Sequence, residues 1–105
     1  MNRIKKSWTY ILKCSDSTFY TGCTTNLNQR MTQHKEGLYD GYTKRRRPVR
    51  LVWFEEFGDI NEAIEAERQI KNWSQAKKRA LIRGDIESLK KLAQSKEMRV
   101  RRKRR

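Results

Sequence analysis

The sequence predicts a small domain of the α+β class, because a pair of short strand-like segments comes first and further strand and helix patterns follow. The chain has 105 residues, which suits one compact domain. Residues 7–14 and 18–23 are rich in aromatic and β-branched side chains, and Ser15-Asp16-Ser17 between them has turn chemistry. These segments are predicted to form a β-hairpin.

A helix is predicted from Asn26 to about Glu36. Thr24 or Thr25 can cap its N-terminus, and Gly37 is placed where a glycine commonly ends a helix. Leu27 and Met31 supply the apolar stripe of this helix.

The second half of the chain predicts a loop, a strand and helices, in that order. Residues 38–50 show neither a helical nor an alternating period, which indicates a loop. Residues 51–57 have the composition of a buried third strand. Helices are then predicted over residues 60–73 and 74–83 and from residue 85 onward, with N-caps at Asp59, Ser74 and Asp85.

The chain is strongly basic, with a formal net charge of +14. Residues 96–105 hold seven Lys or Arg and no apolar pattern, so we expect a disordered basic tail beyond a folded domain over residues 1–95. The folded part remains basic without the tail. A nucleic acid is the expected partner, because cations that contact phosphates release condensed counterions.

A membrane span and a secretory signal are not predicted, since no apolar run is long enough for either. A cytoplasmic location is therefore expected, with Cys14 and Cys23 as reduced thiols too far apart along the hairpin for a disulfide.

Two cationic side chains interrupt the apolar face of the helix predicted over residues 26–36. On a helical wheel, Arg30 and His34 fall on the same arc as Leu27 and Met31 and so point toward the sheet. Either Arg30 has an acceptor there, or its stem packs while its head reaches water. His34 is either functional or a core histidine bonded to backbone.

Glu67 interrupts the apolar stripe of the next long helix in the same way, between positions occupied by Ala63 and Ile64. One interpretation is a surface ion pair with Lys71 at i, i+4, which contributes only a few tenths of a kcal/mol. The other is a ligand for Mg²⁺, which commonly binds one or two carboxylates and completes its shell with water and phosphate oxygens.

Tyr10 and Tyr20 lie on the two hairpin strands and are either ordinary sheet residues or part of a site. They share a face of the sheet only if opposed residue numbers sum to an even value. A two-residue turn at Asp16-Ser17 gives an odd sum, so a longer loop or a bulge is predicted.

Taken together, these residues resemble the GIY-YIG nuclease family over residues 8 to 94. Trp8-Thr9-Tyr10 stands for the first signature tripeptide, Tyr20-Thr21-Gly22 for the second, and residues 26–31 for the helix that follows. Trp8 departs from the family's leading glycine. The resemblance implies a three-stranded antiparallel sheet flanked by helices, in β-β-α-β-α-α-α order, and small stand-alone members of this family exist.

The resemblance also implies roles for individual residues in hydrolysis of a phosphodiester, assisted by one Mg²⁺ or Mn²⁺ ion. Tyr10 matches a proposed base toward water, and Tyr20 a residue at the phosphate or the water. Arg30 matches the arginine that stabilises charge on the phosphate, His34 a residue that assists proton transfer, and Glu67 the metal ligand. The family's asparagine beyond the glutamate has no match here.

The function expected from this resemblance is that of a metal-dependent endonuclease, acting on DNA more than RNA, in repair or recombination. Contacts to the nucleic acid are expected from Lys44, Arg45, Arg46, Arg47 and Lys71, and from the tail. Two alternatives stay open, a non-catalytic nucleic-acid-binding module with the same fold and a basic ribosome-associated protein. A monomer is the default expectation.

Overall fold

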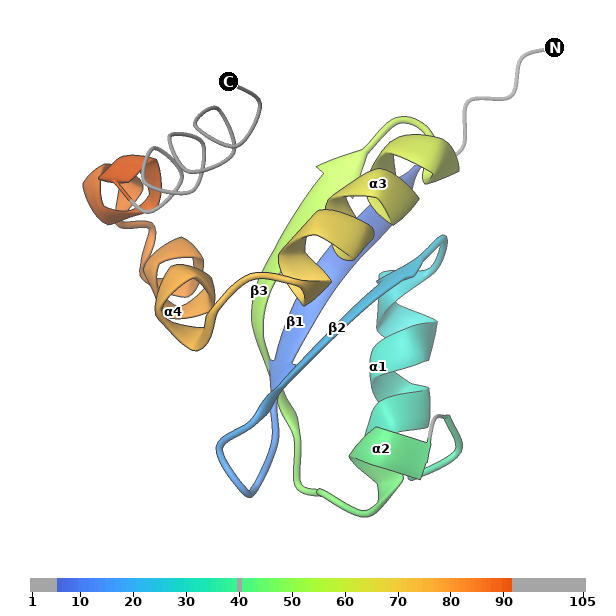
Figure 1. Ribbon diagram of the computed structural model, residues 1–105. Helices are drawn as coiled ribbons and strands as arrows, with labels where there is room; N and C mark the ends of the chain where they lie inside the picture. The colour runs from blue at the N-terminus through green and yellow to red at the C-terminus, as the bar shows by residue number, and fades with distance from the viewer. Residues whose placement is uncertain (1–5, 40, 92–105) are drawn as a thin grey trace, which may run out of the picture. The chain divides into compact units, whose positions relative to one another are not determined.

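The strands of the computed structural model form a three-stranded antiparallel sheet in the order β2-β1-β3. The structure describes residues 6–39 and 41–91. The elements, in chain order in Figure 1, are β1 (Ser7–Lys13), β2 (Phe19–Thr24), α1 (Leu27–Lys35), α2 (Gly41–Lys44), β3 (Arg50–Phe57), α3 (Ile60–Lys71) and α4 (Gln75–Arg83). Residues 86–91 are also helical. The α+β class and the antiparallel sheet flanked by helices are thus confirmed.

A three-residue loop, 15–17, joins β1 to β2. The amide of Cys14 donates to the Thr18 carbonyl at 2.9 Å, and the amide of Ser17 donates to the Cys14 carbonyl at 2.9 Å. Ser17 has a φ of 70°, the left-handed conformation that closes three-residue hairpin loops. Asp16 stabilises the loop by accepting hydrogen bonds from the Thr18 amide and hydroxyl. The predicted longer loop is confirmed.

This loop sets the register that places the two tyrosines together. Tyr10 lies opposite Gly22, and Leu12 lies opposite Tyr20, so opposed residue numbers have an even sum. Directly opposed residues of an antiparallel pair project to one face. Tyr10 and Tyr20 therefore share a face of the sheet, as expected for a common site.

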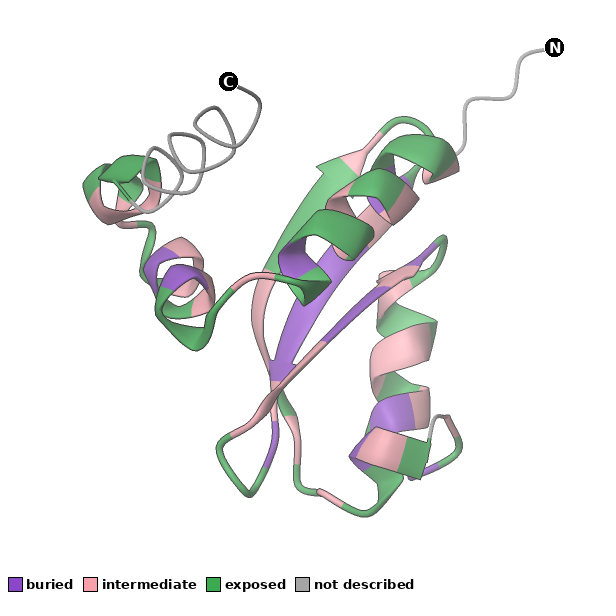
Figure 2. Ribbon diagram, in the orientation of Figure 1, coloured by how far each residue is buried: buried purple, intermediate pink, exposed green. Residues whose placement is uncertain are grey.

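The two faces of the sheet carry different helices. On β1, the Thr9 hydroxyl donates to the Ala63 carbonyl of α3 at 2.7 Å, whereas the Tyr10 hydroxyl lies 2.9 Å from Nε2 of His34 on α1. Consecutive strand residues point to opposite faces. Hence α3 covers one face and α1 the other, and β1 is buried between them, as the colours of Figure 2 show.

The helix ends follow the predicted caps with one exception. Asn26 caps α1 by accepting from the Gln29 amide at 3.0 Å, so the prediction of Thr24 or Thr25 as the cap was wrong. Asn26 sits next to the first helical residue, where its carbonyl-bearing side chain reaches the helix amides. The other predicted helix ends are confirmed at Gly37, Asp59, Ser74, Gly84 and Asp85.

The short helix α2 lies inside the segment predicted to be a loop, and that prediction was wrong for residues 41–44. A four-residue helix is too short to show a period in sequence. Arg47 ties it to α1, since its guanidinium donates to the carbonyls of Lys44 at 3.1 Å and Lys35 at 3.5 Å. A Cβ added to Gly37, whose φ is +72°, would lie 2.8 Å from that guanidinium carbon.

The chain divides into two compact units, Met1–Asn72, which contains the sheet and α1 to α3, and Trp73–Arg105, which contains α4. Within the second unit, the Lys77 ammonium lies 4.2 Å from the centre of the Trp73 ring. The predicted domain limit at residue 95 and the basic tail lie outside the described residues. Cys14 and Cys23 are not joined by a disulfide bond. Across the described ranges, every helix is too short or too polar to span a bilayer.

Two buried threonines on the α3 face of the sheet make a matched test of this packing. Thr9 bonds to Ala63, whereas the hydroxyl of Thr21 has no partner among the described residues. We expect Thr9→Val to lower the free energy of unfolding by about 1 kcal/mol, because a buried hydrogen bond is lost. We expect Thr21→Val to leave it unchanged or to raise it. Urea denaturation measures both, and equal losses would contradict the assigned bonding.

Gly22 provides the space in which the Tyr10 phenol lies. A Cβ added at Gly22 would stand 2.6 Å from the Tyr10 hydroxyl oxygen, closer than real atoms approach. We expect Gly22→Ala to displace the phenol and to destabilise the fold by about 1–3 kcal/mol, as overpacked cores do. Gly41→Ala is the control, since an added Cβ there meets nothing within 4 Å. Thermal unfolding of both variants measures the difference, and an equally small effect of both would contradict it.

Candidate functional site

A cluster of aromatic side chains on the α1 face surrounds the buried imidazole of His34. Nε2 of His34 lies 2.9 Å from the Tyr10 hydroxyl oxygen, and both side chains are fully buried. The Tyr20 ring centre lies 6.4 Å from that of Tyr10 and 5.3 Å from that of His34. Tyr10, Tyr20 and His34 are thus brought together. Both ring nitrogens of His34 lie at hydrogen-bond distance from side-chain hydroxyls, those of Tyr10 and Thr43, which favours a functional histidine over one bonded to backbone.

Arg30 lies on α1 one turn before His34 and directs its guanidinium inward. The guanidinium carbon lies 4.0 Å from the centre of the Tyr39 ring, and Nη1 donates to the Cys23 carbonyl at 3.4 Å. A cation over an aromatic face is attracted by the electron-rich ring. The head group therefore has partners in the protein at the edge of β2, which favours the first of the two interpretations of Arg30.

Burial dominates the acid–base behaviour of Tyr10. Removal from water raises the pKa of its phenol well above the ordinary value, and the nearby Arg30 guanidinium opposes that rise. The phenol is therefore neutral in the resting protein. It can lose its proton only to an adjacent acceptor, and the Nε2 atom of His34 is in hydrogen-bond contact with it.

Glu67 lies on α3, and so on the face of the sheet opposite to Tyr10. Its side chain is 17% exposed, and one oxygen lies 2.8 Å from Nζ of Lys71. The other oxygen accepts from the Cys23 thiol at 3.7 Å. Burial, and next the adjacent Glu67 carboxylate, raise the pKa of Cys23. The surface ion pair considered from the sequence is present, but the carboxylate also faces β2.

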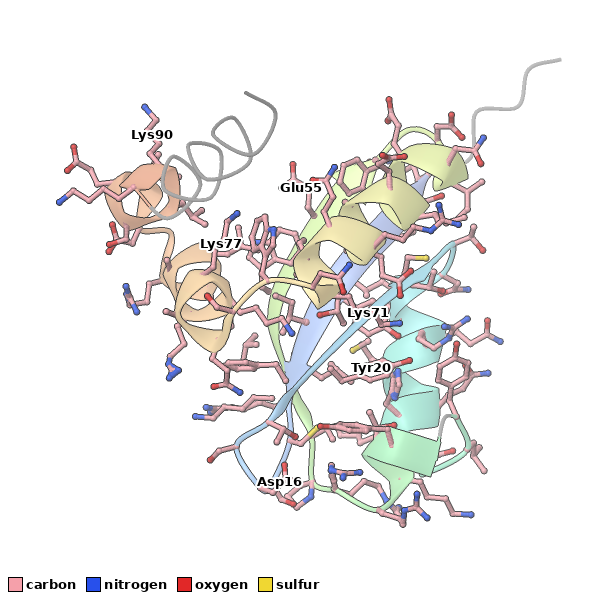
Figure 3. The ribbon with its side chains drawn as sticks, in the orientation of Figure 1. Asp16, Tyr20, Glu55, Lys71, Lys77 and Lys90 are labelled. Atoms are coloured by element: carbon pink, nitrogen blue, oxygen red, sulfur yellow. The ribbon has the colours of Figure 1, made fainter. Side chains whose placement is uncertain are left out.

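Cys23 on the edge strand β2 connects the two halves of this site. Its carbonyl accepts from Arg30, which belongs to the α1 side, and its thiol donates to Glu67, which belongs to the α3 side. Figure 3 shows Tyr20 reaching from β2 toward α1, with Lys71 at the end of α3. The five predicted catalytic residues therefore do not converge on one point of one face. Tyr10, Tyr20 and His34 cluster on the α1 face, whereas Arg30 and Glu67 reach Cys23 of β2 from its two sides.

Of the five predicted nucleic-acid contacts, Lys71 lies on α3 and pairs with Glu67, and the other four lie at the end of α2 and just after it. Lys44 and Arg45 are exposed at the end of α2. Arg46 instead donates to Asp16 at 3.0 Å and lies 3.8 Å above the Tyr42 ring, and Arg47 donates to backbone carbonyls. Arg46 and Arg47 thus have a structural role in addition to any role in binding.

A divalent metal ion is compatible with the donors present. Within residues 6–39 and 41–91, no three His, Cys, Asp or Glu side chains cluster as ligands. Glu67 would therefore hold a metal as its sole carboxylate, a donor set that suits Mg²⁺ or Mn²⁺ with water and phosphate oxygens in the other positions. When bound, such an ion supplies positive charge to a reacting phosphate. Lys71 would have to give up its bond to Glu67.

Three residues near the site have no counterpart in the sequence-based prediction. Tyr39 packs edge-on against His34 with ring centres 5.0 Å apart, Tyr42 stacks on Tyr20 at 6.1 Å, and Thr43 bonds to His34. All three come from residues 38–44, where no period marks a helix. Tyr39 precedes α2, and Tyr42 and Thr43 lie within its four residues, which are too few to show a period, so no sequence signal pointed to them.

Comparisons with known proteins agree with this fold. Residues 6–80 match the family model described as the GIY-YIG catalytic domain. A UPF0213 protein of Syntrophus aciditrophicus is 42% identical over 87 residues, which cover 82% of this chain and 100% of that protein. A UPF0213 protein of Listeria monocytogenes is 40% identical over 84% of this chain and 99% of its own. The solution structure of protein EF2693 from E. faecalis has a TM-score of 0.54 at 33% identity, over 80% of this chain and 90% of that one. The chain therefore belongs to the GIY-YIG family, and its relatives are UPF0213 proteins, small stand-alone members of that family.

Proposed function

We propose that this protein is an endonuclease that hydrolyses phosphodiester bonds in nucleic acid with the help of Mg²⁺ or Mn²⁺. The observation that supports this most strongly is the buried hydrogen bond of 2.9 Å between the Tyr10 phenol and the His34 imidazole. A buried phenol in contact with an imidazole and next to a guanidinium is suited to proton transfer at a charged substrate. An aromatic core alone does not need this arrangement.

The proposed roles are those that the family resemblance implies, and the positions of Tyr10, His34 and Arg30 support them. Once its proton has passed to His34, the Tyr10 phenolate is the base that takes a proton from the attacking water. The guanidinium of Arg30, already at the edge of β2, stabilises the negative charge that develops on the phosphate oxygens. Tyr20 contacts the phosphate or the water, and Glu67 holds the metal.

The substrate phosphate is proposed to lie along the outer edge of β2. Arg30 and Glu67 reach Cys23 from the two sides of this strand, so a phosphate and a cation at this edge could meet both. The net charge of +14 favours a polyanionic substrate. DNA rather than RNA, and repair or recombination as the setting, belong to the same proposal.

A non-catalytic nucleic-acid-binding module is the second candidate. The observation that favours it is the ion pair between Glu67 and Lys71 at 2.8 Å, which neutralises the carboxylate that the metal needs. The two candidates differ in whether Glu67 matters beyond binding, and this can be measured directly.

Cleavage of labelled linear, nicked, flapped and four-way DNA and of RNA, with Mg²⁺ or Mn²⁺, distinguishes the candidates. We expect Glu67→Gln and Tyr10→Phe each to slow single-turnover cleavage by at least about 100-fold, since metal and proton transfer each supply several kcal/mol. Glu65→Gln, an exposed carboxylate on the same helix, is the control and should cleave normally. If wild type binds but cleaves nothing, or if Glu67→Gln and wild type cleave equally, the binding module is the better description.

The exposed and the structurally bonded cations should behave differently on substitution. We expect Lys44→Ala with Arg45→Ala to weaken nucleic-acid binding and to lower the slope of log affinity against log salt by about 1 per lost phosphate contact. The thermal midpoint should stay the same, because both side chains are exposed. Arg47→Ala should also lower the midpoint, because α1 and α2 lose the bonds that it donates. Unchanged affinity in the double variant would show that these two residues at the end of α2 do not contact the nucleic acid.

A further inference from the structure

The orientation of His34 depends on a residue that lies nine positions further along the chain. Both ring nitrogens have side-chain partners, with Nε2 at 2.9 Å from the Tyr10 oxygen and Nδ1 at 2.9 Å from Oγ1 of Thr43. A neutral imidazole has one N–H group, so one nitrogen donates and the other accepts. The direction in which the Thr43 hydroxyl donates its proton decides which ring nitrogen carries the N–H.

The Thr43 hydroxyl has a partner for its proton four residues earlier in the chain, the carbonyl of Tyr39. Thr43 is fully buried, and its oxygen lies 3.1 Å from the Tyr39 carbonyl oxygen. A hydroxyl has one proton and a carbonyl can only accept, so the proton of Thr43 points at Tyr39. Its lone pairs then remain for Nδ1 of His34, and the hydrogen between Nδ1 and Thr43 has to come from the imidazole.

We propose that Thr43 is a positioning residue, which fixes His34 in the tautomer with a protonated Nδ1 and a bare Nε2 directed at the Tyr10 hydroxyl. In this state Nε2 accepts the hydrogen bond from Tyr10. When Tyr10 is deprotonated, its O–H bond breaks and an N–H bond forms at Nε2, which leaves a phenolate and an imidazolium. The use of this proton transfer in cleavage rests on the proposed function, whereas the tautomer does not.

The aromatic rings around His34 keep the imidazole from turning over, which would move its two nitrogens away from their partners. The rings of Tyr10, Tyr20 and Tyr39 meet the imidazole edge-on, with centres 5.7, 5.3 and 5.0 Å away. Such packing fixes the ring plane, and the hydrogen bonds at its two nitrogens then select the tautomer. The short helix α2 thus has a specific task, which is to hold one hydroxyl at Nδ1.

The chain contains a single histidine, so the tautomer can be read from NMR without ambiguity. In uniformly ¹⁵N-labelled protein, two-bond correlations from the ring protons give the shifts of both His34 nitrogens. The spectrum is recorded near pH 9, above the ordinary histidine pKa of about 6.5. We expect Nδ1 to have the shift of a protonated nitrogen and Nε2 that of a bare one. The reverse pattern, or an even mixture, would overturn the proposal.

Substitution of Thr43 tests whether its hydroxyl fixes the tautomer of His34. We expect Thr43→Val to move the proton wholly or partly to Nε2, and Thr43→Ser to restore the wild-type pattern. Thr32→Val is the matched control, because the Thr32 hydroxyl likewise donates to the carbonyl four residues earlier, that of Asn28, but on an exposed face of α1. An unchanged Nδ1–H pattern in folded Thr43→Val would overturn the proposal. If that variant does not fold, the wild-type spectrum alone still decides.

If the protein cleaves nucleic acid, the cleavage rates of the Thr43 variants give a second test of the positioning role. We expect Thr43→Val to cleave about 10- to 100-fold more slowly, as is typical when the partner that orients a histidine is removed, and Thr43→Ser to recover most of the rate. A slow Thr43→Val with an unchanged tautomer would assign the loss to packing and overturn the positioning role. The expected tautomer in a protein that cleaves nothing would instead contradict the proposed function alone.

Discussion

The register of β1 against β2 is the constraint on which the site depends. The three-residue loop with its left-handed Ser17 aligns Tyr10 with Gly22 and sends Tyr10 and Tyr20 to the same face. A shift by one residue would turn every side chain of one strand to the other face. The phenol would then lose both the space over Gly22 and its contact with His34. The hairpin loop is thus as important to the site as the residues that form it, and Arg46 fastens it through Asp16.

Much of this arrangement follows from sequence because local signals agree with the tertiary structure. Aromatic and β-branched composition with turn chemistry predicted both hairpin strands, and caps and apolar stripes predicted the long helices. Helical phase predicted the inward direction of Arg30 and His34. The element α2 could not be predicted, since four residues show no period and its position depends on long-range bonds from Arg47. The partners of His34 on that element were missed for the same reason.

The sequence also could not predict on which face of the sheet Glu67 lies. Its phase on α3 correctly indicated that it faces the sheet, but helical phase does not tell which face of the sheet a helix covers. The structure puts α3 and α1 on opposite faces, so Glu67 approaches the other residues only at the edge of β2. Edge strands have an open side that a substrate can approach, which makes this edge a reasonable place for a phosphate.

We propose that the two sides of β2 form one metal-assisted site around Cys23. Titration of ¹⁵N-labelled protein with Mn²⁺ measures where the ion binds, because the paramagnetic ion broadens the amide signals nearest to it. The expected broadening centres on Cys23 and Glu67 and extends to Arg30. Broadening centred on the exposed carboxylates Glu55 and Glu56, or equal broadening over the whole surface, would contradict it.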